Sequence, residues 1–223
     1  LSQFLSPRMN RRRDGWGGAL AARLRLPLAV VRAVRAAVGP ALPLLAKLNL
    51  RDEVPGGLEL DEAVRVAQAL EGAGVDALVP SGGTVQRSAF YLLRGAVPVR
   101  RMAAAQRSRL QGLAMRALMP TLVKAYPYEP AFFQADAEAV LDAVSIPVAL
   151  LGGVDSSSVI RRALGRGFSL VAMGRALLAD PDFIARLAAG EEPRSRCTHC
   201  NECVAEMDRA GVRCVLPPRR DAS

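Results

Sequence analysis

The chain has 223 residues, of which 51% are hydrophobic, and it carries a formal net charge of +9. This length and composition suit one globular domain of ordinary size. Its apolar runs are all shorter than the ~18 residues of a membrane-spanning helix, and the first residues lack the pattern of a signal peptide. We therefore expect a cytoplasmic protein without a membrane partner.

The positive charge raises the question of a nucleic-acid partner, because basic patches bind phosphate. Only Lys47 and Lys124 of the 30 basic residues are lysines, and the arginines are spread along the chain together with alanine. Aromatic residues make up only 4%, which leaves few platforms for base stacking. We therefore favour a bias in coding composition and expect no nucleic-acid partner; the run 11–13 (RRR) fits a solvated turn better than an anion patch.

The predicted elements alternate between helix and strand. In chain order they are a helix over 20–38, a strand over 44–48 with Lys47 at its end, a helix over 60–73, a strand over 76–79, a long excursion over 84–130 with a helix near 102–118, a helix over 136–144, a strand over 147–151, a helix capped by Asp155 and running to about 164, a strand over 169–173, and a helical stretch from 174 past 181.

This alternation predicts an α/β fold in which parallel strands are joined by crossover helices. Open doubly wound sheets and closed (β/α)8 TIM barrels both have this pattern, and the crossovers alone do not separate them. Four strands are visible, whereas a barrel needs eight. If the fold is a barrel, its first half is absent from this sequence.

Two of the predicted strands end in glycine loops that lead directly into helices. Gly152 and Gly153 follow the strand over 147–151, and Gly174 and Arg175 follow the strand over 169–173. Bare backbone amides at helix starts bind phosphate, and in barrels a phosphate site commonly lies at the loops after strands seven and eight. The pair predicts a phosphate clamp to which Arg175 adds a charged contact. The alternative is that these glycines only permit tight turns.

All four cysteines, Cys197, Cys200, Cys203 and Cys214, lie close together near the end of the chain. In a cytosolic protein such a cluster indicates metal or redox chemistry rather than disulfides. Four thiolates suit an iron–sulfur cluster or a tetrahedral zinc ion, and unligated thiols are the remaining alternative. His199, the only histidine, is a spare ligand rather than a general base.

Six motifs carry a family resemblance, in matching order and spacing. They are "FLSP", the run with Asn10, Arg12, Asp14, Trp16, Gly17, Gly18 and Arg23, and then "AKLNLRD", "VDALVPSGG", "IPVALLGGV" and "VAMGRALLADPDF". Together they resemble the old yellow enzyme family of flavin-dependent NADH:flavin oxidoreductases. The tail "RCTHCNEC" resembles that of the relatives akin to 2,4-dienoyl-CoA reductase.

The resemblance implies an FMN-binding TIM barrel that passes hydride from NAD(P)H through FMN to a small acceptor with an electron-poor alkene or carbonyl. It implies that residues 1–190 are the C-terminal part of the barrel, strands five to eight, and that 191–223 are a Cys-rich tail. The first residues, which precede the strand over 44–48, would then be the segment in which the chain exits a fourth strand of the barrel. The family's substrate-holding His pair and proton-donating Tyr would lie upstream of Leu1. We therefore expect no catalytic residue here, and an isolated fragment that binds FMN weakly or not at all.

The resemblance also assigns roles to single residues. Lys47 would face the flavin pyrimidine, although an ordinary surface lysine is the alternative. Gly152, Gly153, Gly174 and Arg175 would bind the FMN phosphate. The motif at Asn10, Arg12 and Asp14 would be structural, through turn hydrogen bonds and ion pairing.

Other assignments stay open. We expect Tyr91, Tyr126 and Tyr128 to pack the long loop rather than touch substrate. The cysteines are spaced more closely than is usual in the iron–sulfur relatives, with iron–sulfur still favoured over zinc. The main alternative function is a non-catalytic phosphate- or metal-binding module derived from such a barrel. Oligomerisation is left open.

Overall fold

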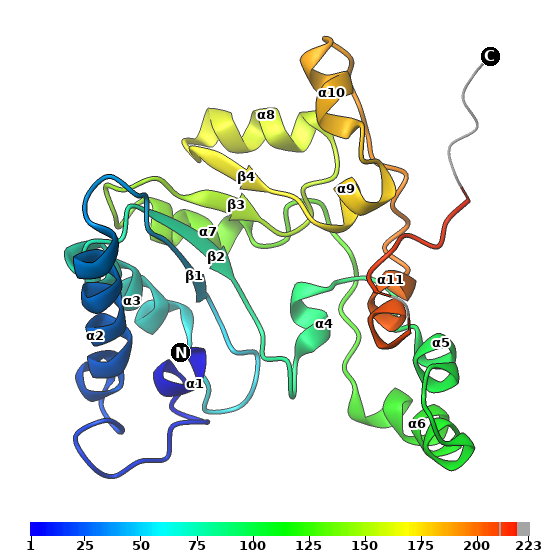
Figure 1. Cartoon of the computed structure of the whole chain (residues 1–223), viewed down its shortest axis with the longest axis horizontal. Helices are drawn as coiled ribbons and strands as arrows, with labels where there is room; N and C mark the ends of the chain where they lie inside the picture. The colour runs from blue at the N-terminus through cyan, green and yellow to red at the C-terminus, as the bar shows by residue number, and fades with distance from the viewer. Residues whose placement is uncertain (210, 218–223) are drawn as a thin grey trace.

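The computed structural model describes residues 1–209 and 211–217. Its strands are β1 (Leu45–Asn49), β2 (Ala77–Ser81), β3 (Ala149–Leu151) and β4 (Leu170–Ala172). β1 pairs with β2 and β3 with β4, both in parallel, and a parallel bridge between Leu78 and Val148 joins the two pairs. The strands thus lie side by side in chain order, with helices in the connections (Figure 1). This arrangement is consistent with a partial α/β barrel: the alternation of elements predicts the parallel strands and crossover helices, and the family resemblance predicts the barrel.

The helices of the described residues are α1 (Ser2–Leu5), α2 (Leu20–Val38), α3 (Leu60–Gly72), α4 (Ala89–Leu92), α5 (Val99–Ala104), α6 (Arg109–Leu122), α7 (Gln134–Leu141), α8 (Ser157–Arg166), α9 (Arg175–Ala179), α10 (Phe183–Ala188) and α11 (Glu202–Ala205), followed by a 3-10 turn, η1 (Glu206–Asp208). None of the helices in this described part combines the length and the apolar character needed to cross a bilayer.

The core lies between the strands and the helices that cover their outer face. Leu78, Val148 and Leu150 of the central strands are completely buried. They pack in one cluster with side chains such as Val66 of α3 and Val140 of α7. Burial on one face of the sheet fixes the register of the strands, because a slip by one residue would turn these side chains away from the helices.

Along β1 the side chains alternate between the two faces. Leu48 is buried, whereas Leu45 and Lys47 point to the inner, open side of the sheet and are exposed. Lys47 is the third of the five residues of β1 and pairs in register with Val79. The prediction that Lys47 ends its strand is therefore wrong, because the ladder continues through Asn49.

Two predicted helices are each divided in the structure. The stretch near 102–118 consists of α5 and α6, separated by an extended residue at Ser108 (φ −106°, ψ 132°). The stretch after Gly174 consists of α9 and α10, and Asp180 between them is extended (φ −132°, ψ 84°). Pro181 explains this second break, because proline disfavours the helical conformation in the residue before it.

The first residues form helix α1 rather than the exit of a strand, since Ser6 N donates to Ser2 O at 3.1 Å. Arg23 is buried and binds this segment to the body, because its guanidinium donates to Leu5 O and pairs with Glu62 of α3. Burial of an ion pair is tolerated only where hydrogen bonds satisfy both groups.

The Asn10 motif has the structural role expected of it. Asn10 Nδ2 donates to the carbonyls of Phe4 and Trp16 at 2.9 and 2.7 Å. Arg12 Nε donates to Asp14 Oδ1 at 3.0 Å, and this salt bridge is exposed. These bonds close the turn, and the residues lie outside every cavity described below.

Candidate functional site

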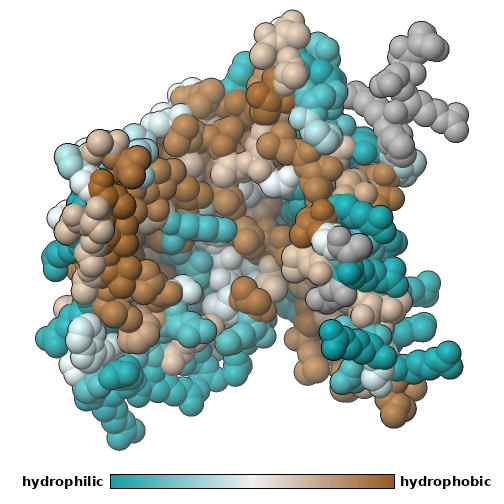
Figure 2. Space-filling model, in the orientation of Figure 1, coloured by the Kyte–Doolittle hydropathy of each residue, from teal (hydrophilic) through white to brown (hydrophobic). Residues whose placement is uncertain are grey.

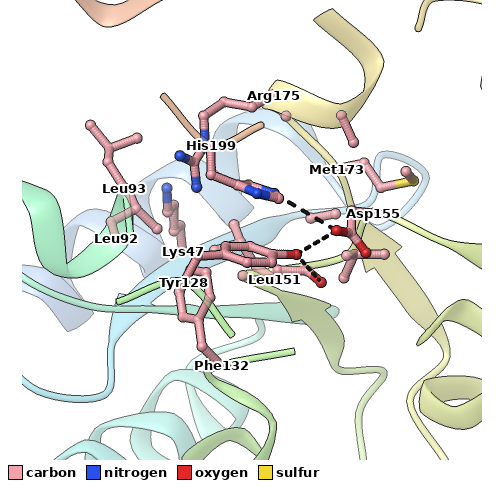
Figure 3. A pocket seen from close by; sticks show the side chains of 16 residues that line it. Lys47, Leu92, Leu93, Tyr128, Phe132, Leu151, Asp155, Met173, Arg175 and His199 are labelled. Atoms are coloured by element: carbon pink, nitrogen blue, oxygen red, sulfur yellow. Dashed lines mark hydrogen bonds and ion pairs between the residues drawn. The ribbon is translucent and has the colours of Figure 1, made fainter. Parts of the chain in front are cut away.

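The predicted cofactor-binding residues meet in one cavity of about 240 Å³, which we call the loop cavity. The loops after β3 and β4 supply much of its wall, and α4, the segment before α7 and the cysteine tail supply the rest. Figure 3 shows the labelled side chains converging on this space. Lys47, Gly152, Gly153, Gly174 and Arg175 all line it. The sequence had placed these residues at three separate points of the chain, and the fold brings all of them together.

Lys47 reaches the loop cavity from the inner face of β1. It also lines a second cavity of about 290 Å³, between β1 and α2, whose wall is mostly aliphatic. Within the described residues Lys47 forms no salt bridge. Its ammonium group is thus a positive charge without a protein counter-ion at the edge of the loop cavity.

Gly152 and Gly153 have a structural reason to be glycine. Their φ angles are +100° and +74°, which side chains with a Cβ rarely adopt. A Cβ on Gly152 would lie 2.7 Å from the Phe133 ring, and one on Gly153 would lie 2.6 Å from the backbone nitrogen of Ala131. The tight-turn alternative therefore accounts for this pair by itself.

Gly174 differs from this pair. Its φ is −119°, and a Cβ built on it meets no atom within 4 Å. Packing against the described residues therefore does not require glycine at this position. A side chain here would fill open space at the wall of the loop cavity. A bare backbone at such a place is what close approach by a ligand requires.

Arg175 follows Gly174, and its guanidinium forms hydrogen bonds with groups of the protein. Its Nη1 donates to the carbonyl of Arg94 at 2.9 Å and to the side-chain oxygen of Asn201. Burial lowers the pKa of the guanidinium below its ordinary value, although nearby thiols act in the opposite direction. Arg175 therefore contributes a fixed positive charge whose position is set by the tail.

Three further side chains in the cavity form a connected group. Tyr128 Oη donates to Asp155 Oδ2 at 2.7 Å, and its ring stacks on His199 with centroids 3.3 Å apart and planes at 12°. His199 Nε2 lies 3.7 Å from the same Asp155 oxygen (Figure 3). The carboxylate thus lies under two aromatic side chains from distant parts of the chain.

Burial dominates the electrostatics of this group. It lowers the pKa of His199 to about 4, with Arg175 as the second cause, so the ring is neutral at pH 7. It also raises the pKa of Tyr128, and the hydrogen bond to Asp155 acts in the same direction. Tyr128 is therefore a protonated donor throughout the physiological range.

Sequence reasoning missed these roles. Tyr91 and Tyr126 are buried in the core as loop-packing residues, whereas Tyr128 lines the loop cavity, and whether it touches substrate stays a prediction. Asp155 does not cap α8: Ser156 occupies that position without a side-chain cap bond, and the Asp155 carboxylate accepts from Tyr128 instead. His199 has a positive φ of 57°, which is unusual for a non-glycine residue and often marks a functional site. The sequence gives no indication of this backbone conformation.

The four cysteines line a separate small cavity of about 20 Å³, the cysteine cavity, together with Arg175. All four are free thiols of intermediate exposure. As the described side chains stand, no three His, Cys, Asp or Glu residues are arranged to hold a metal ion. Burial raises the pKa of Cys197 and of Cys203, which keeps both protonated at pH 7. Four cysteine thiolates would suit a soft metal ion or an iron–sulfur cluster. In the described structure, however, the four side chains are free thiols and are not arranged around a common metal position.

The tail that carries the cysteines is bound firmly to the body. Asn201 is buried, and its Nδ2 donates to the carbonyls of Leu93 and Ala96. Arg101 of α5 pairs with Glu202 and Glu206, each at 3.0 Å. These contacts hold His199 at the wall of the loop cavity. The cysteines line the cysteine cavity instead, and Arg175 lines both cavities.

Comparison with known proteins shows which family the chain resembles. The model of the NADH:flavin oxidoreductase / NADH oxidase family matches residues 1–90. The 4,4'-dithiodibutanoate disulfide reductase of Rhodococcus erythropolis is 39% identical over the whole chain, and the NADH oxidase of Thermoanaerobacter brockii is 29% identical over 98% of it. The chain belongs to the NADH:flavin oxidoreductase / NADH oxidase family.

Solved structures show the same fold for this family member. A 2-naphthoyl-CoA reductase superposes on 97% of the chain with a TM-score of 0.72 at 22% identity. The old yellow enzyme homologue from Zymomonas mobilis superposes on 87% with a TM-score of 0.57 at 18% identity. The chain spans only 54% of the length of the Rhodococcus relative and 30% of the Thermoanaerobacter relative.

Proposed function

We propose that this chain supplies the phosphate-binding and pyrimidine-facing side of an FMN site in an NAD(P)H-dependent oxidoreductase. The observation that carries the proposal is the convergence of Lys47, Gly174 and Arg175 on the loop cavity. No packing contact of the described residues requires glycine at 174, and this residue leaves open the space that a bound group would fill. At about 240 Å³ the cavity is somewhat below the ~300–1,000 Å³ of typical ligand sites, which suits one part of a cofactor.

Each residue has a distinct task in this proposal. The amides at Gly153 and Gly174 donate to phosphate oxygens, and Arg175 adds positive charge beside them. Lys47 places its ammonium where negative charge on the reduced flavin ring is stabilised. When bound, FMN would supply the chemistry of hydride transfer between NAD(P)H and the acceptor. Tyr128 and His199 close one side of the cavity as neutral rings.

The acceptor class is part of the same proposal. We propose a small molecule with an electron-poor alkene or carbonyl, and the name of the 39% identical relative adds a disulfide as a third class. A non-catalytic phosphate- or metal-binding module is not favoured, because the matched relatives are named as reductases and oxidases. We also propose that the four cysteines hold a metal centre, iron–sulfur before zinc, since all four line one cavity.

Flavin titration of the purified chain tests the phosphate clamp. FMN and riboflavin differ only in the phosphate group, so the clamp predicts that FMN binds at least about tenfold more tightly, followed by fluorescence quenching. Gly174→Gln fills the open space and should remove this preference. Gly165→Gln is the matched control, because Gly165 also has open surroundings but lies on α8, away from the cavity. Equal affinities for the two flavins would overturn the proposal.

A further inference from the structure

Four arginines surround a cavity of about 320 Å³ between α5 and α6, on the side of the molecule away from α2 (Figure 1). They are Arg100, Arg107, Arg109 and Arg116. We call this space the arginine cavity. It shares no lining residue with the loop cavity or the cysteine cavity. Figure 2 shows hydrophilic side chains projecting from this part of the surface.

Close packing of the two helices creates the cavity. Gly112 of α6 lies so near α5 that a Cβ there would be 2.7 Å from the carbonyl oxygen of Ala103. Arg109 and Arg116 are seven residues apart and share one face of α6. Arg100 comes from α5 and Arg107 from the turn between the helices. The turn that divides the predicted single helix is thus what brings the four side chains around one space.

The positive charge of this cluster is not balanced by any acidic side chain in the part of the chain that the structure describes. Within the described residues none of the four makes a salt bridge, and no acidic residue lines the cavity. Their neighbour Arg101 shows the contrast, because it pairs with both Glu202 and Glu206. Like charges held near one another destabilise the fold by mutual repulsion. A bound anion with several negative charges would relieve this repulsion.

We propose that the arginine cavity binds a small molecule that carries two or more phosphate groups, as in a pyrophosphate or a nucleoside bisphosphate. Guanidinium groups bind phosphate oxygens in pairs, and four of them suit a polyphosphate better than a single carboxylate. Ser108 and Gln106 also line the cavity and add neutral hydrogen-bonding groups.

The shape and lining of the site favour a small ligand over a macromolecule. The four exposed arginines border a shallow depression of about 320 Å³, a volume at the lower end of the ~300–1,000 Å³ of small-molecule sites. No aromatic side chain lines it, so it has no platform for stacking the bases of single-stranded nucleic acid. Arg107 also lines an adjoining cavity with Arg209, which extends the positive surface toward the tail.

Isothermal titration of the full chain with inorganic pyrophosphate and with adenosine 3′,5′-bisphosphate tests this site, with orthophosphate as the singly phosphorylated comparison. Pyrophosphate should bind more tightly than orthophosphate, and the affinity should fall as salt is added. Tighter binding of the nucleotide than of pyrophosphate identifies a nucleotide ligand, and equal binding identifies the phosphates alone. Both results support the site.

Variants separate this cavity from general positive charge. Arg109→Gln and Arg116→Gln should each weaken pyrophosphate binding about tenfold, the loss of one charged hydrogen bond. Arg32→Gln is the matched control, because Arg32 is exposed on α2 and forms no salt bridge to a described residue. Equal losses in all three variants would overturn the proposal, as would binding only to DNA or to anionic vesicles. The flavin titration uses other residues, so either proposal can fail alone.

Discussion

The ring of Tyr128 covers the imidazole of His199 face to face, with centroids 3.3 Å apart. Tyr128 precedes α7 and His199 lies in the cysteine tail, so this stack joins the barrel to the tail at the wall of the loop cavity. It keeps water from the imidazole and from the Asp155 carboxylate beneath. The protonation of His199 therefore reports on the closure of this junction.

Stability should fall in mild acid because of His199. Its pKa in the folded chain is about 4, below the 6.5 of an unfolded histidine, so the unfolded chain binds the proton more readily between these values. Stability from the neutral ring is complete above pH 6.5 and is lost as the pH falls toward 4, by on the order of 3 kcal/mol. Urea unfolding at several pH values measures it. His199→Phe keeps a ring and should flatten this part of the profile; an unchanged slope would contradict the assignment.

The Tyr128 hydroxyl should matter more than that of a more deeply buried tyrosine. Tyr128→Phe removes the hydrogen bond to Asp155, which is only 4% exposed, and leaves that carboxylate short of a donor. We expect a loss of about 1–3 kcal/mol in unfolding free energy. Tyr91→Phe is the control, because the Tyr91 hydroxyl donates to no described group. Similar losses in the two variants would contradict a special role for the Asp155 bond.

Two glycines should respond to alanine in opposite directions. Gly153→Ala forces a Cβ into a left-handed conformation and into contact with Glu129 O at 2.6 Å, so it should cost about 2 kcal/mol or more. Gly165→Ala places a methyl group in open space on α8 and should add about 0.5–1 kcal/mol. Thermal unfolding of both variants measures the difference, and a shift of the same sign in both would contradict the described backbone.

Metal content should depend on all four cysteines. Chain purified without oxygen should contain iron and sulfide, or zinc, and substitution of any cysteine by serine should lower the content. Thr198→Ser is the control, because Thr198 lines the same cavity without a thiol. Binding should weaken as the pH falls, since the raised pKa values of Cys197 and Cys203 make their deprotonation costly. A metal content unaffected by the serine variants would refute the proposed centre.

The outer strands should promote self-association. Among the described strands β1 and β4 are each paired on one side only, and Leu170 of β4 is 47% exposed. Leu170→Lys should lower the average mass in light scattering, because charge at a strand edge opposes edge pairing. Leu164→Lys is the matched control, since Leu164 is 49% exposed but lies on α8. An equal effect of both lysines would point to general charge repulsion instead.

Local signals explain what the sequence predicted well. Helix α2 has the predicted bounds, and each predicted strand exists within a few residues, because periodic burial and glycine turns act over short distances. The gathering of Gly152, Gly153, Gly174 and Arg175 around one cavity follows from parallel strands that end at a common edge, whereas Lys47 reaches this cavity from the inner face of β1.

Contacts between distant segments explain what the sequence missed. Tyr128 and His199 are 71 positions apart, and no spacing rule connects them. The four arginines of the arginine cavity look like part of an evenly spread composition, and only the packing of Gly112 against Ala103 brings them together. Asp155 resembles a helix cap in sequence, but in the structure its carboxylate accepts a hydrogen bond from Tyr128.

Arg175 lines both the loop cavity and the cysteine cavity. Any occupant of one cavity that moves or neutralises this guanidinium changes the electric field in the other. By thermodynamic linkage the effect is reciprocal: a group that binds at the thiols would alter affinity at the loops by the same factor as the loop ligand alters affinity at the thiols. A single side chain, fixed by Asn201, thus makes the two sites energetically one system.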